Sequence, residues 1–597
     1  MIDHAALPTV AAAVATALAL GLGALLVWKP LSEAWTRVPS IERVYPPEAQ
    51  PGWAGALRDP RTPLVNDGAI HCYDPATGYV LGTALADSPD TIRTKIARAA
   101  DAQRVWRGSS MAQRRLVLRT MHAWIQRDLE PIARIACRDT GKTAIDAAFG
   151  ELLTTCAKLA WTLHHGERVL RPERRSGNLL LAHKTCTVVH EPLGVVAACV
   201  SWNYPVHNML GPIISALFTG NAIVVKGSEH VAWSSQHMLE GVRRCLAACG
   251  APTDVVQLVA CGPDAVEALT RDPRIAHITF IGSDAVGRRV AAAAAPQLTP
   301  TRLELGGKDP AIVLPDTDLP FFASMFLRAC FQAMGQNCIG IERFLVPRAR
   351  INELVALVLP RIEALRAGST LDDTRFGNRE APADSVDVGA MISDARFDTL
   401  EALIREAVAQ GAQLHTGGTR LAHTRWPLGH YFAPTLLSHV TPAMRIANEE
   451  LFAPVLLIMS YDSVEEAVQI ANGTPFGLGA SVFGRSRTQC RSVAAQLECG
   501  MVNINDFGIS YLNQGLPFGG RKHSGYGRFG GPEGLQGLTA PKALTEDTLF
   551  GRIQTAIPPV VDYPVRNTLR SWTFLRSLVR LAFGSWWARV QAIPGLC

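Results

Sequence analysis

One cysteine of the chain lies in a setting that suits a nucleophile. Cys338 occurs in FQAMGQNCIGIERFLV, between a helical run and a strand-like run, with Gly335 and Gly340 close on either side. These glycines let backbone approach the thiol and allow it to sit in an open turn. Most of the thirteen cysteines are expected to be small buried apolar residues. Cys338 therefore needs a partner before a reaction is assigned to it.

Two other segments offer a base and a hydrogen-bond donor. Glu304 opens ELGGK, where Gly306 and Gly307 leave room around a carboxylate that could act as a base toward a thiol or a water. Asn203 lies in SWNYPVHN between two aromatic residues, and its side-chain amide suits an oxyanion. Each has a plainer interpretation, because an isolated glutamate is usually a solvated surface residue and Asn203 could equally be a turn residue.

Two further segments suit a dinucleotide. VVKGSEH follows a strand directly, at the carboxyl end of a parallel sheet where ligands bind. FIGSDAVGRRV forms a strand-to-helix junction, whose free amides can receive a phosphate. Neither is a G-x-G-x-x-G fingerprint. The residues of interest are Lys226, Ser228, Glu229, Gly282, Ser283 and Gly287.

The elements that must position these residues alternate along the chain. From Asp90 to about Val169, apolar residues recur three and four apart, which predicts helices. From about Leu193, short runs rich in Val, Ile and Ala alternate with helical stretches, as a parallel sheet with crossover helices requires. The expected strands are GVVAACV, NAIVVKG, VVQLVA, AHITFIG and DPAIVL. After Glu304 we expect a second α/β unit with helices at 352–366 and 396–410 and strands at VLLIMSY and ASVFG.

Composition limits the classes of function. The 597 residues carry a formal net charge of +6, and five of the positive charges are arginines in a tail without acids. The nearly neutral body gives no reason to expect nucleic acid as a partner. The cysteines are odd in number and scattered, with no C-x-x-C, which suits a reducing compartment and predicts no metal site. The five arginines are Arg566, Arg570, Arg576, Arg580 and Arg589.

The N-terminal segment is strongly apolar. No residue from Ala5 to Trp28 is charged, and the run from Val10 to Trp28 is about long enough to cross a hydrocarbon core as a helix. We expect a single-pass membrane anchor; a cleaved signal peptide is the alternative, but no lysine or arginine precedes the run. Basic residues follow it, so the positive-inside rule places the catalytic body in the cytoplasm, with the endoplasmic reticulum as one candidate membrane.

Taken together, the motifs resemble the aldehyde dehydrogenase superfamily over roughly Val65 to Asp547. SWNYP is similar to the family's P-W-N-[FY]-P, ELGGK is complete, GQNC is similar to G-Q-x-C, and 34 residues separate Glu304 from Cys338 as in the family. NEELFAPV resembles E-E-x-F-G-P-V, and LPFGGRKHSGYGRFGG resembles P-F-G-G-x-K-x-S-G-x-G-R. The chain is most similar to a membrane-associated fungal and plant subgroup that includes proteins named for meiotic sister-chromatid recombination.

The resemblance implies an α/β fold with a Rossmann-like NAD-binding domain, an α/β catalytic domain and a small β oligomerisation element, here with an N-terminal transmembrane helix. It implies that Cys338 attacks an aldehyde, that Asn203 holds the oxyanion while hydride passes to NAD, and that Glu304 activates water to hydrolyse the thioester. The alternatives are a coenzyme A-acylating semialdehyde dehydrogenase, whose members generally lack this glutamate, and an inactive membrane scaffold. The implied cofactor contacts are Ser201, Trp202, Lys226, Ser228, Glu229, Gly282, Ser283, Gly287, Leu305, Glu450 and Phe452.

The resemblance also implies a division of the chain and a homodimer or homotetramer. We expect an anchor at 1–30, a Pro-rich connector at 31–64, an NAD-binding domain at 65–303 with an oligomerisation hairpin near 180–193, and a catalytic domain at 304–515. Residues 516–550 would return to the NAD-binding and oligomerisation elements, and 551–597 would form a basic amphipathic tail.

Three positions depart from the family pattern: Ser201 replaces a proline, Gly227 replaces a proline or small residue, and Ala453 replaces a glycine. None removes a reacting group, but alanine at a position of positive φ would be strained, which puts the cofactor pose in doubt. Glu229 can accept hydrogen bonds from the adenosine ribose and would repel a 2′-phosphate, so NAD is favoured, while Lys226 keeps NADP possible.

Residues 568–592, placed on one helix, put arginines and other polar residues on one arc and large apolar residues on the other. Such a helix suits the surface of an anionic membrane. The alternative is a helix docked on the protein's own body or on a second subunit. The polar arc holds Arg570, Thr573, Arg576, Ser577, Arg580 and Gln591, and the apolar arc holds Leu575, Leu578, Val579, Phe583, Trp586 and Val590.

Overall fold

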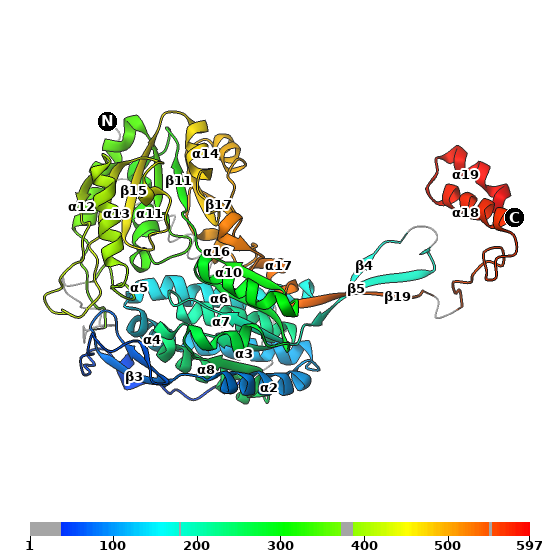
Figure 1. Ribbon diagram of the computed structural model, residues 1–597, viewed down its shortest axis with the longest axis horizontal. Helices are drawn as coiled ribbons and strands as arrows, with labels where there is room; N and C mark the ends of the chain where they lie inside the picture. The colour runs from blue at the N-terminus through cyan, green and yellow to red at the C-terminus, as the bar shows by residue number, and fades with distance from the viewer. Residues whose placement is uncertain (1–37, 178–180, 372–385, 549–551, 597) are drawn as a thin grey trace, which may run out of the picture.

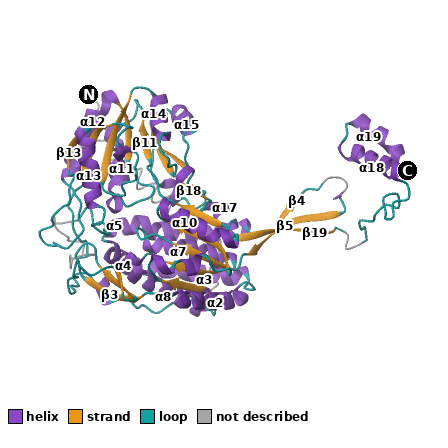
Figure 2. Ribbon diagram, in the orientation of Figure 1, coloured by secondary structure: helices purple, strands orange, loops and turns teal. Residues whose placement is uncertain are grey.

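The structure is a computed structural model that describes residues 38–177, 181–371, 386–548 and 552–596. Two α/β lobes form a body, a narrow β arm projects from one of them, and a small helical unit lies beyond the arm (Figure 1). Helices cover both faces of the two large sheets (Figure 2). This arrangement matches the expected α/β architecture, with each lobe holding one sheet.

The sheet of the first lobe has the strand order β18-β10-β9-β6-β7-β8 and is parallel except for β18. Its strands are almost wholly buried and apolar, as strands covered by helices on both faces must be. Four of them are the runs that the sequence predicted as strands. In chain order the strands are β6 (Val195–Cys199), β7 (Ala222–Lys226), β8 (Val256–Val259), β9 (Ile275–Ile281), β10 (Thr301–Glu304) and β18 (Gly525–Tyr526).

Helices precede and separate these strands, and local signals set their ends. Ser88 and Ser110 cap the first two long helices by accepting hydrogen bonds from backbone amides, and Gly220 ends α7 in the left-handed region at φ 83°. The helices are α2 (Pro89–Trp106), α3 (Met111–Arg127), α4 (Leu129–Thr140), α5 (Ala144–Ala147), α6 (Thr154–Val169), α7 (Pro205–Thr219), α8 (Ala232–Ala248), α9 (Glu267–Thr270) and α10 (Asp284–Ala294).

The second lobe has a sheet in the order β13-β14-β15-β12-β11-β16-β17, parallel except at β13. Its strands are β11 (Pro310–Val313), β12 (Arg343–Pro347), β13 (Gln413–Thr416), β14 (Thr435–Val440), β15 (Val455–Tyr461), β16 (Gly479–Phe483) and β17 (Met501–Ile504). Its helices are α11 (Leu319–Phe331), α12 (Ile351–Glu363), α13 (Phe397–Ala409), α14 (Val464–Asn472) and α15 (Arg487–Ala494), followed by the short α16 (Ile509–Leu512). The short α17 (Gly531–Gln536) follows β18 and packs on α6 and α7 of the first lobe.

The chain passes between the lobes at two places. It leaves the first sheet at the end of β10 and enters the second at β11, so Glu304 lies at the crossing. It returns when β18 pairs antiparallel with β10, Glu304 opposite Gly525. The predicted acid is thus held where the two lobes meet.

A small sheet and the residues before it complete the first lobe. β1 (Val65–Asn66), β2 (Ala69–Tyr73) and β3 (Val80–Leu85) form a three-stranded sheet in that order. The Pro-rich connector packs on the helices: Arg127 donates a hydrogen bond to the carbonyl of Ile41 at 2.9 Å, and Arg138 donates to the carbonyl of Glu48 at 2.8 Å.

The arm contains β4 (Glu173–Arg175), β5 (Lys184–Pro192) and β19 (Thr539–Asp547), in the order β19-β5-β4. β19 pairs with β5 along its whole length, from Thr539 opposite Pro192 to Asp547 opposite Lys184. Two segments more than 340 residues apart therefore form one antiparallel ribbon that extends away from the body (Figure 1).

The prediction of a single-pass membrane protein is corrected here. None of the helices in the described parts of the chain combines the length and the apolar character needed to cross a membrane. The run from Val10 to Trp28, on which that prediction depended, lies outside the described residues.

The tail is helical, but it is not one helix. α18 (Thr568–Phe583) ends at Gly584, and α19 (Trp586–Ala592) begins anew with Ser585 as its cap. The two helices pack on each other, so Ser577 of the expected polar arc is buried, while Phe583 and Trp586 are largely exposed. The expected contact with a lipid surface stays a prediction.

Candidate active site

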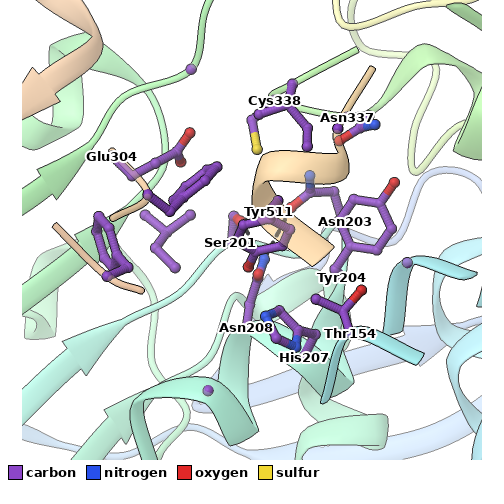
Figure 3. Close-up of a pocket in the computed structure, with 18 of the residues that line it drawn as sticks. Thr154, Ser201, Asn203, Tyr204, His207, Asn208, Glu304, Asn337, Cys338 and Tyr511 are labelled. Carbon is purple, nitrogen blue, oxygen red and sulfur yellow. Dashed lines mark hydrogen bonds between the residues drawn. The ribbon is translucent and has the colours of Figure 1, made fainter. Parts of the chain in front are cut away.

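A cavity of about 460 Å³ lies where the lobes meet, and the three predicted catalytic residues line it. Cys338 comes from the loop before β12, Glu304 from the end of β10, and Asn203 from the loop before α7. Their side chains project into one space from three separate segments (Figure 3). Residues that are 135 positions apart in sequence thus form one constellation.

The turn before Cys338 has an unusual backbone. Ala333, Met334 and Gly335 all have positive φ, at 51°, 59° and 69°. A Cβ on Gly335 would lie 2.1 Å from the carbonyl oxygen of Ala453, so only glycine fits there. Three consecutive left-handed residues store strain of the kind found at functional sites. The turn ends α11 abruptly and presents Cys338 at the cavity.

Glu304 is fully buried beside Cys338. The Cys338 thiol and the backbone N–H of Gly306 both act on this carboxylate and lower its pKa in part, while its Oε1 atom has no hydrogen-bond partner among the described residues. Burial raises the pKa of Glu304 to about 7. Burial, reinforced by the negative charge of Glu304, raises the pKa of the Cys338 thiol above its usual value. The pKa values of the cysteine and the acid therefore depend on each other.

The Asn203 side chain is held by a network. Its Nδ2 donates to the carbonyl of Gln336 at 3.0 Å, and its Oδ1 accepts from Ser201 Oγ at 2.7 Å and from Asn208 Nδ2 at 3.2 Å. The amide retains a second N–H, since Nδ2 carries two. Ser201, which replaces the family's proline, therefore contributes to the orientation of Asn203.

A buried ion pair that the sequence did not reveal supports this loop. Lys142 Nζ donates to Glu151 at 2.7 Å and to the carbonyl of Asn203 at 2.6 Å. Glu151 accepts from the backbone N–H groups of Val206 and His207, which open α7. In sequence both residues look like ordinary charges near helices, so only the fold shows that they position Asn203.

A second wall of the cavity holds the expected nicotinamide-side residues. Glu450 accepts a hydrogen bond from the backbone N–H of Gly307 at 3.0 Å, and the rings of Trp202 and Phe452 meet edge to face at 5.5 Å. The expected strain at Ala453 does not occur: the positive φ in this segment, 53°, belongs to Phe452. The extra methyl is accommodated without a left-handed backbone.

The strand-to-helix junction after β9 also faces this wall. Gly282 and Ser283 line the cavity, and Ser283 precedes α10 without a side-chain cap, so the first amides of the helix keep free donors. A Cβ on Gly287 would lie 2.2 Å from Leu305 Cδ2, which explains the glycine as a packing requirement. The junction suits a phosphate-bearing ligand.

Lys226, Ser228 and Glu229 lie apart from the cavity that holds Cys338. Lys226 is the last residue of β7, which lies next to β6 in the sheet, and Ser228 and Glu229 follow it. Lys226 Nζ contacts Glu229 Oε2 at 3.0 Å. Ser228 Oγ accepts from the backbone N–H of His230. A ligand that reached both groups would have to extend along the carboxyl edge of the sheet, as a dinucleotide does.

Comparison of the chain with known proteins identifies the family to which it is similar. The aldehyde dehydrogenase family matches residues 65–544. An aldehyde dehydrogenase-like protein of Schizosaccharomyces pombe is 48% identical over 527 residues, covering 88% of this chain and 98% of the relative. One of Saccharomyces cerevisiae is 46% identical over 566 residues, covering 92% and 86%.

A solved aldehyde dehydrogenase of Mycobacterium tuberculosis, complexed with NAD⁺, superposes with a TM-score of 0.74 at 30% identity, covering 85% of this chain and 99% of that one. The chain therefore belongs to the aldehyde dehydrogenase family and is an NAD(P)-dependent oxidoreductase of aldehydes.

Proposed function

We propose that the chain oxidises an aldehyde to a carboxylic acid through a thioester on Cys338, which water activated by Glu304 then hydrolyses. The observation that carries the proposal is that Cys338, Glu304 and Asn203 line one cavity, with the Glu304 carboxylate buried where it acts on the Cys338 thiol. A nucleophile, a base and an oxyanion donor are the groups that acyl-enzyme chemistry needs.

The first step moves a proton away from the thiol. Burial raises the pKa of the thiol, so Cys338 is protonated at rest, and its proton passes to Glu304 or to water as the sulfur attacks the carbonyl carbon. The C=O π pair moves to oxygen, which becomes an oxyanion. The second N–H of Asn203 Nδ2 and the backbone N–H of Cys338 are the donors that stabilise it.

The residues that would hold the cofactor fit a nicotinamide dinucleotide. Trp202, Phe452 and Glu450 line the part of the cavity that would hold the ring and its ribose, and the free amides after Ser283 would bind the phosphates. Ser201 also lines the cavity, and Leu305 packs against Gly287 of α10. When bound, the nicotinamide supplies the acceptor for the hydride that leaves the substrate carbon.

The adenosine end favours NAD over NADP. The Glu229 carboxylate keeps its negative charge, since Lys226 at 3.0 Å helps to hold its pKa below the usual value despite its burial. A carboxylate at this edge accepts hydrogen bonds from ribose hydroxyls and repels a 2′-phosphate. Lys226 offsets part of that repulsion, so some use of NADP remains compatible with the site.

The second half of the reaction uses Glu304 again. A pKa of about 7 lets the acid release its first proton to solvent near neutral pH and then take one from the attacking water. The water oxygen bonds to the acyl carbon, the C–S bond breaks, and the thiolate leaves. Because this base is buried against the sulfur, hydrolysis is favoured over transfer of the acyl group to coenzyme A.

We also propose that the arm joins copies of the chain into a homodimer or homotetramer. β19 is an edge strand, exposed along most of its length, and it stands away from the body (Figure 1). Such an edge is a template for pairing with another chain. Light scattering should give a mass of two or four subunits, and a monomer at every concentration would contradict the proposal.

The direct test of function is reduction of NAD by the purified protein with a panel of short, long and aromatic aldehydes. Formation of NADH together with the matching carboxylic acid is the expected result. No NADH with any aldehyde, or NADH that appears only when coenzyme A is added, would contradict the proposal.

A further inference from the structure

Two buried cations line the same cavity and have no acidic partner. Lys158 of α6 is 3% exposed and Arg302 of β10 is 7% exposed. Lys158 Nζ donates to the carbonyl of Phe529 at 3.1 Å, and Arg302 Nη1 donates to the carbonyl of Gly534 at 3.2 Å. Among the described residues, no carboxylate forms an ion pair with either side chain. Because buried charges are normally paired, this pair lacks a counter-ion that the described chain does not supply.

The surroundings of these cations add no negative charge. Burial and the charge of Arg302 lower the pKa of Lys158 to about 8, and burial lowers the pKa of Arg302 to about 10. His207 of α7 is uncharged at neutral pH, since burial and the charge of Lys158 lower its pKa to about 3. Its ring is instead bonded to the Thr155 hydroxyl at 3.0 Å. An anion placed here would be stabilised by both cations.

The cavity joins these cations to the reacting groups. Arg302 and Glu304 are two residues apart in β10, so they project from the same face of the sheet, and both line the cavity. Lys158 is one helical turn beyond Thr154 on α6, and these two residues also line it. A molecule bound in the cavity can therefore contact the two cations and the reacting groups at the same time.

The stretch between the two ends is apolar and has room for a chain. The ring centroids of Tyr511 and Phe518 are 4.3 Å apart, and those of Phe518 and Phe529 are 6.1 Å apart. α7 contributes Gly211 and Ser215, one turn apart and both small. Even a methyl group on Gly211 would have no neighbouring atom closer than 3.8 Å. This middle section suits a run of methylene groups.

We propose that Lys158 and Arg302 bind a carboxylate, so that the preferred substrates are ω-oxo carboxylic acids whose aldehyde carbon reaches Cys338 while the acid group lies at the two cations. The proposal rests on aldehyde oxidation at Cys338. A carboxylate has two oxygens and can accept charge-assisted hydrogen bonds from both side chains. An uncharged alkanal would fill the apolar section and leave both cations without a counter-ion.

The test compares a homologous series of ω-oxo carboxylates with their methyl esters, which have nearly the same shape and no charge. We expect kcat/KM of the wild-type enzyme to favour the acid of the best-fitting length by roughly 10-fold or more, the effect of a hydrogen bond to a charged group. Lys158→Met and Arg302→Met should each reduce this acid-to-ester ratio by about 10-fold, chiefly through KM for the acid. Lys158→Arg should retain most of the preference, because it keeps the charge.

The ratio separates binding from folding, since a merely structural defect lowers both kcat/KM values alike. A wild-type enzyme that oxidises the esters as well as the acids at every length would overturn the carboxylate subsite and leave the proposed function standing. A ratio that Lys158→Met and Arg302→Met leave unchanged would overturn it as well. Failure to oxidise any acid, ester or alkanal would overturn the proposed function itself.

Discussion

The two ends of the cavity differ in how they are built. At the reacting end, Cys338 lies beside the buried Glu304, and Asn203 is fixed by three hydrogen bonds to the chain itself. At the end formed by Lys158 and Arg302, both cations are buried, and no acid of the described ranges pairs with them. The groups around Cys338 therefore determine which reaction occurs, whereas the two cations are open to bind a negatively charged group of the substrate.

The reacting end should be indispensable for every aldehyde. Cys338→Ser should reduce kcat on the order of 10⁴-fold for acids and esters alike, because a hydroxyl is far less ionised than a thiol near neutral pH. NAD binding, measured by calorimetry, should persist. Cys186→Ser, a change in the arm outside the cavity, is the matched control and should be fully active. Full activity of Cys338→Ser would reveal a different nucleophile.

Loss of the base should separate the two halves of the reaction. In Glu304→Gln, hydrolysis of the thioester should slow by roughly 10²- to 10⁴-fold, the usual contribution of a general base. Stopped-flow measurement should then show a rapid first turnover of NADH followed by a slow steady state. Glu353→Gln, on the outer helix α12, is the control. A first turnover as slow as the steady state would show that loss of Glu304 limits formation of the thioester and not its hydrolysis.

The pH dependence should follow from the same carboxyl group. Burial raises the pKa of Glu304 to about 7, and a protonated carboxyl cannot accept a proton from water. Steady-state turnover should therefore fall about 10-fold for each pH unit below that value and level off above it. Glu304→Gln should lose this inflection. An unchanged inflection in that variant would assign it to another group.

A smaller effect should come from the residue that departs from the family pattern. Ser201→Ala removes the hydrogen bond to Asn203 Oδ1 and should lower kcat about 5-fold, the effect of one neutral hydrogen bond. The loss should be equal for acids and esters, unlike that of the Lys158 variants. Ser463→Ala, which removes a cap from the surface helix α14, should leave kcat unchanged. No change in kcat for Ser201→Ala would mean that the other two bonds orient Asn203 by themselves.

The residues around Cys338 could be predicted from the sequence, whereas Lys158 and Arg302 could not, and the difference has a physical reason. Cys338, Glu304 and Asn203 occur in short segments rich in glycine, proline and aromatic residues, so their local setting is visible in sequence. The strands that carry them were equally visible, because buried parallel strands are continuous apolar runs. Ala453 shows a limit of this reasoning, since which residue takes the positive φ depends on the whole turn, and here it is Phe452.

Lys158 and Arg302 gave no such signal. Each is a lone cation in a helix or strand and looks like a solvated residue until α6, β10 and the segment around Phe529 are brought together. The tail shows the opposite limit: its composition predicted an amphipathic helix, but Gly584 breaks it into two packed helices and turns Ser577 inward. Both the burial of the two cations and the burial of Ser577 depend on packing between segments, which the local sequence does not show.

The thioester mechanism is tested most directly by measuring the covalent state of Cys338 during turnover. Glu304→Gln should be mixed with NAD and an aldehyde, quenched in acid within the first turnover, digested and examined by mass spectrometry. If a thioester forms on Cys338, the peptide containing Cys338 should gain the mass of the acyl group in proportion to the NADH formed. Cys338→Ser should show neither the added mass nor NADH. NADH formation without an acyl adduct on Cys338 would contradict the thioester mechanism.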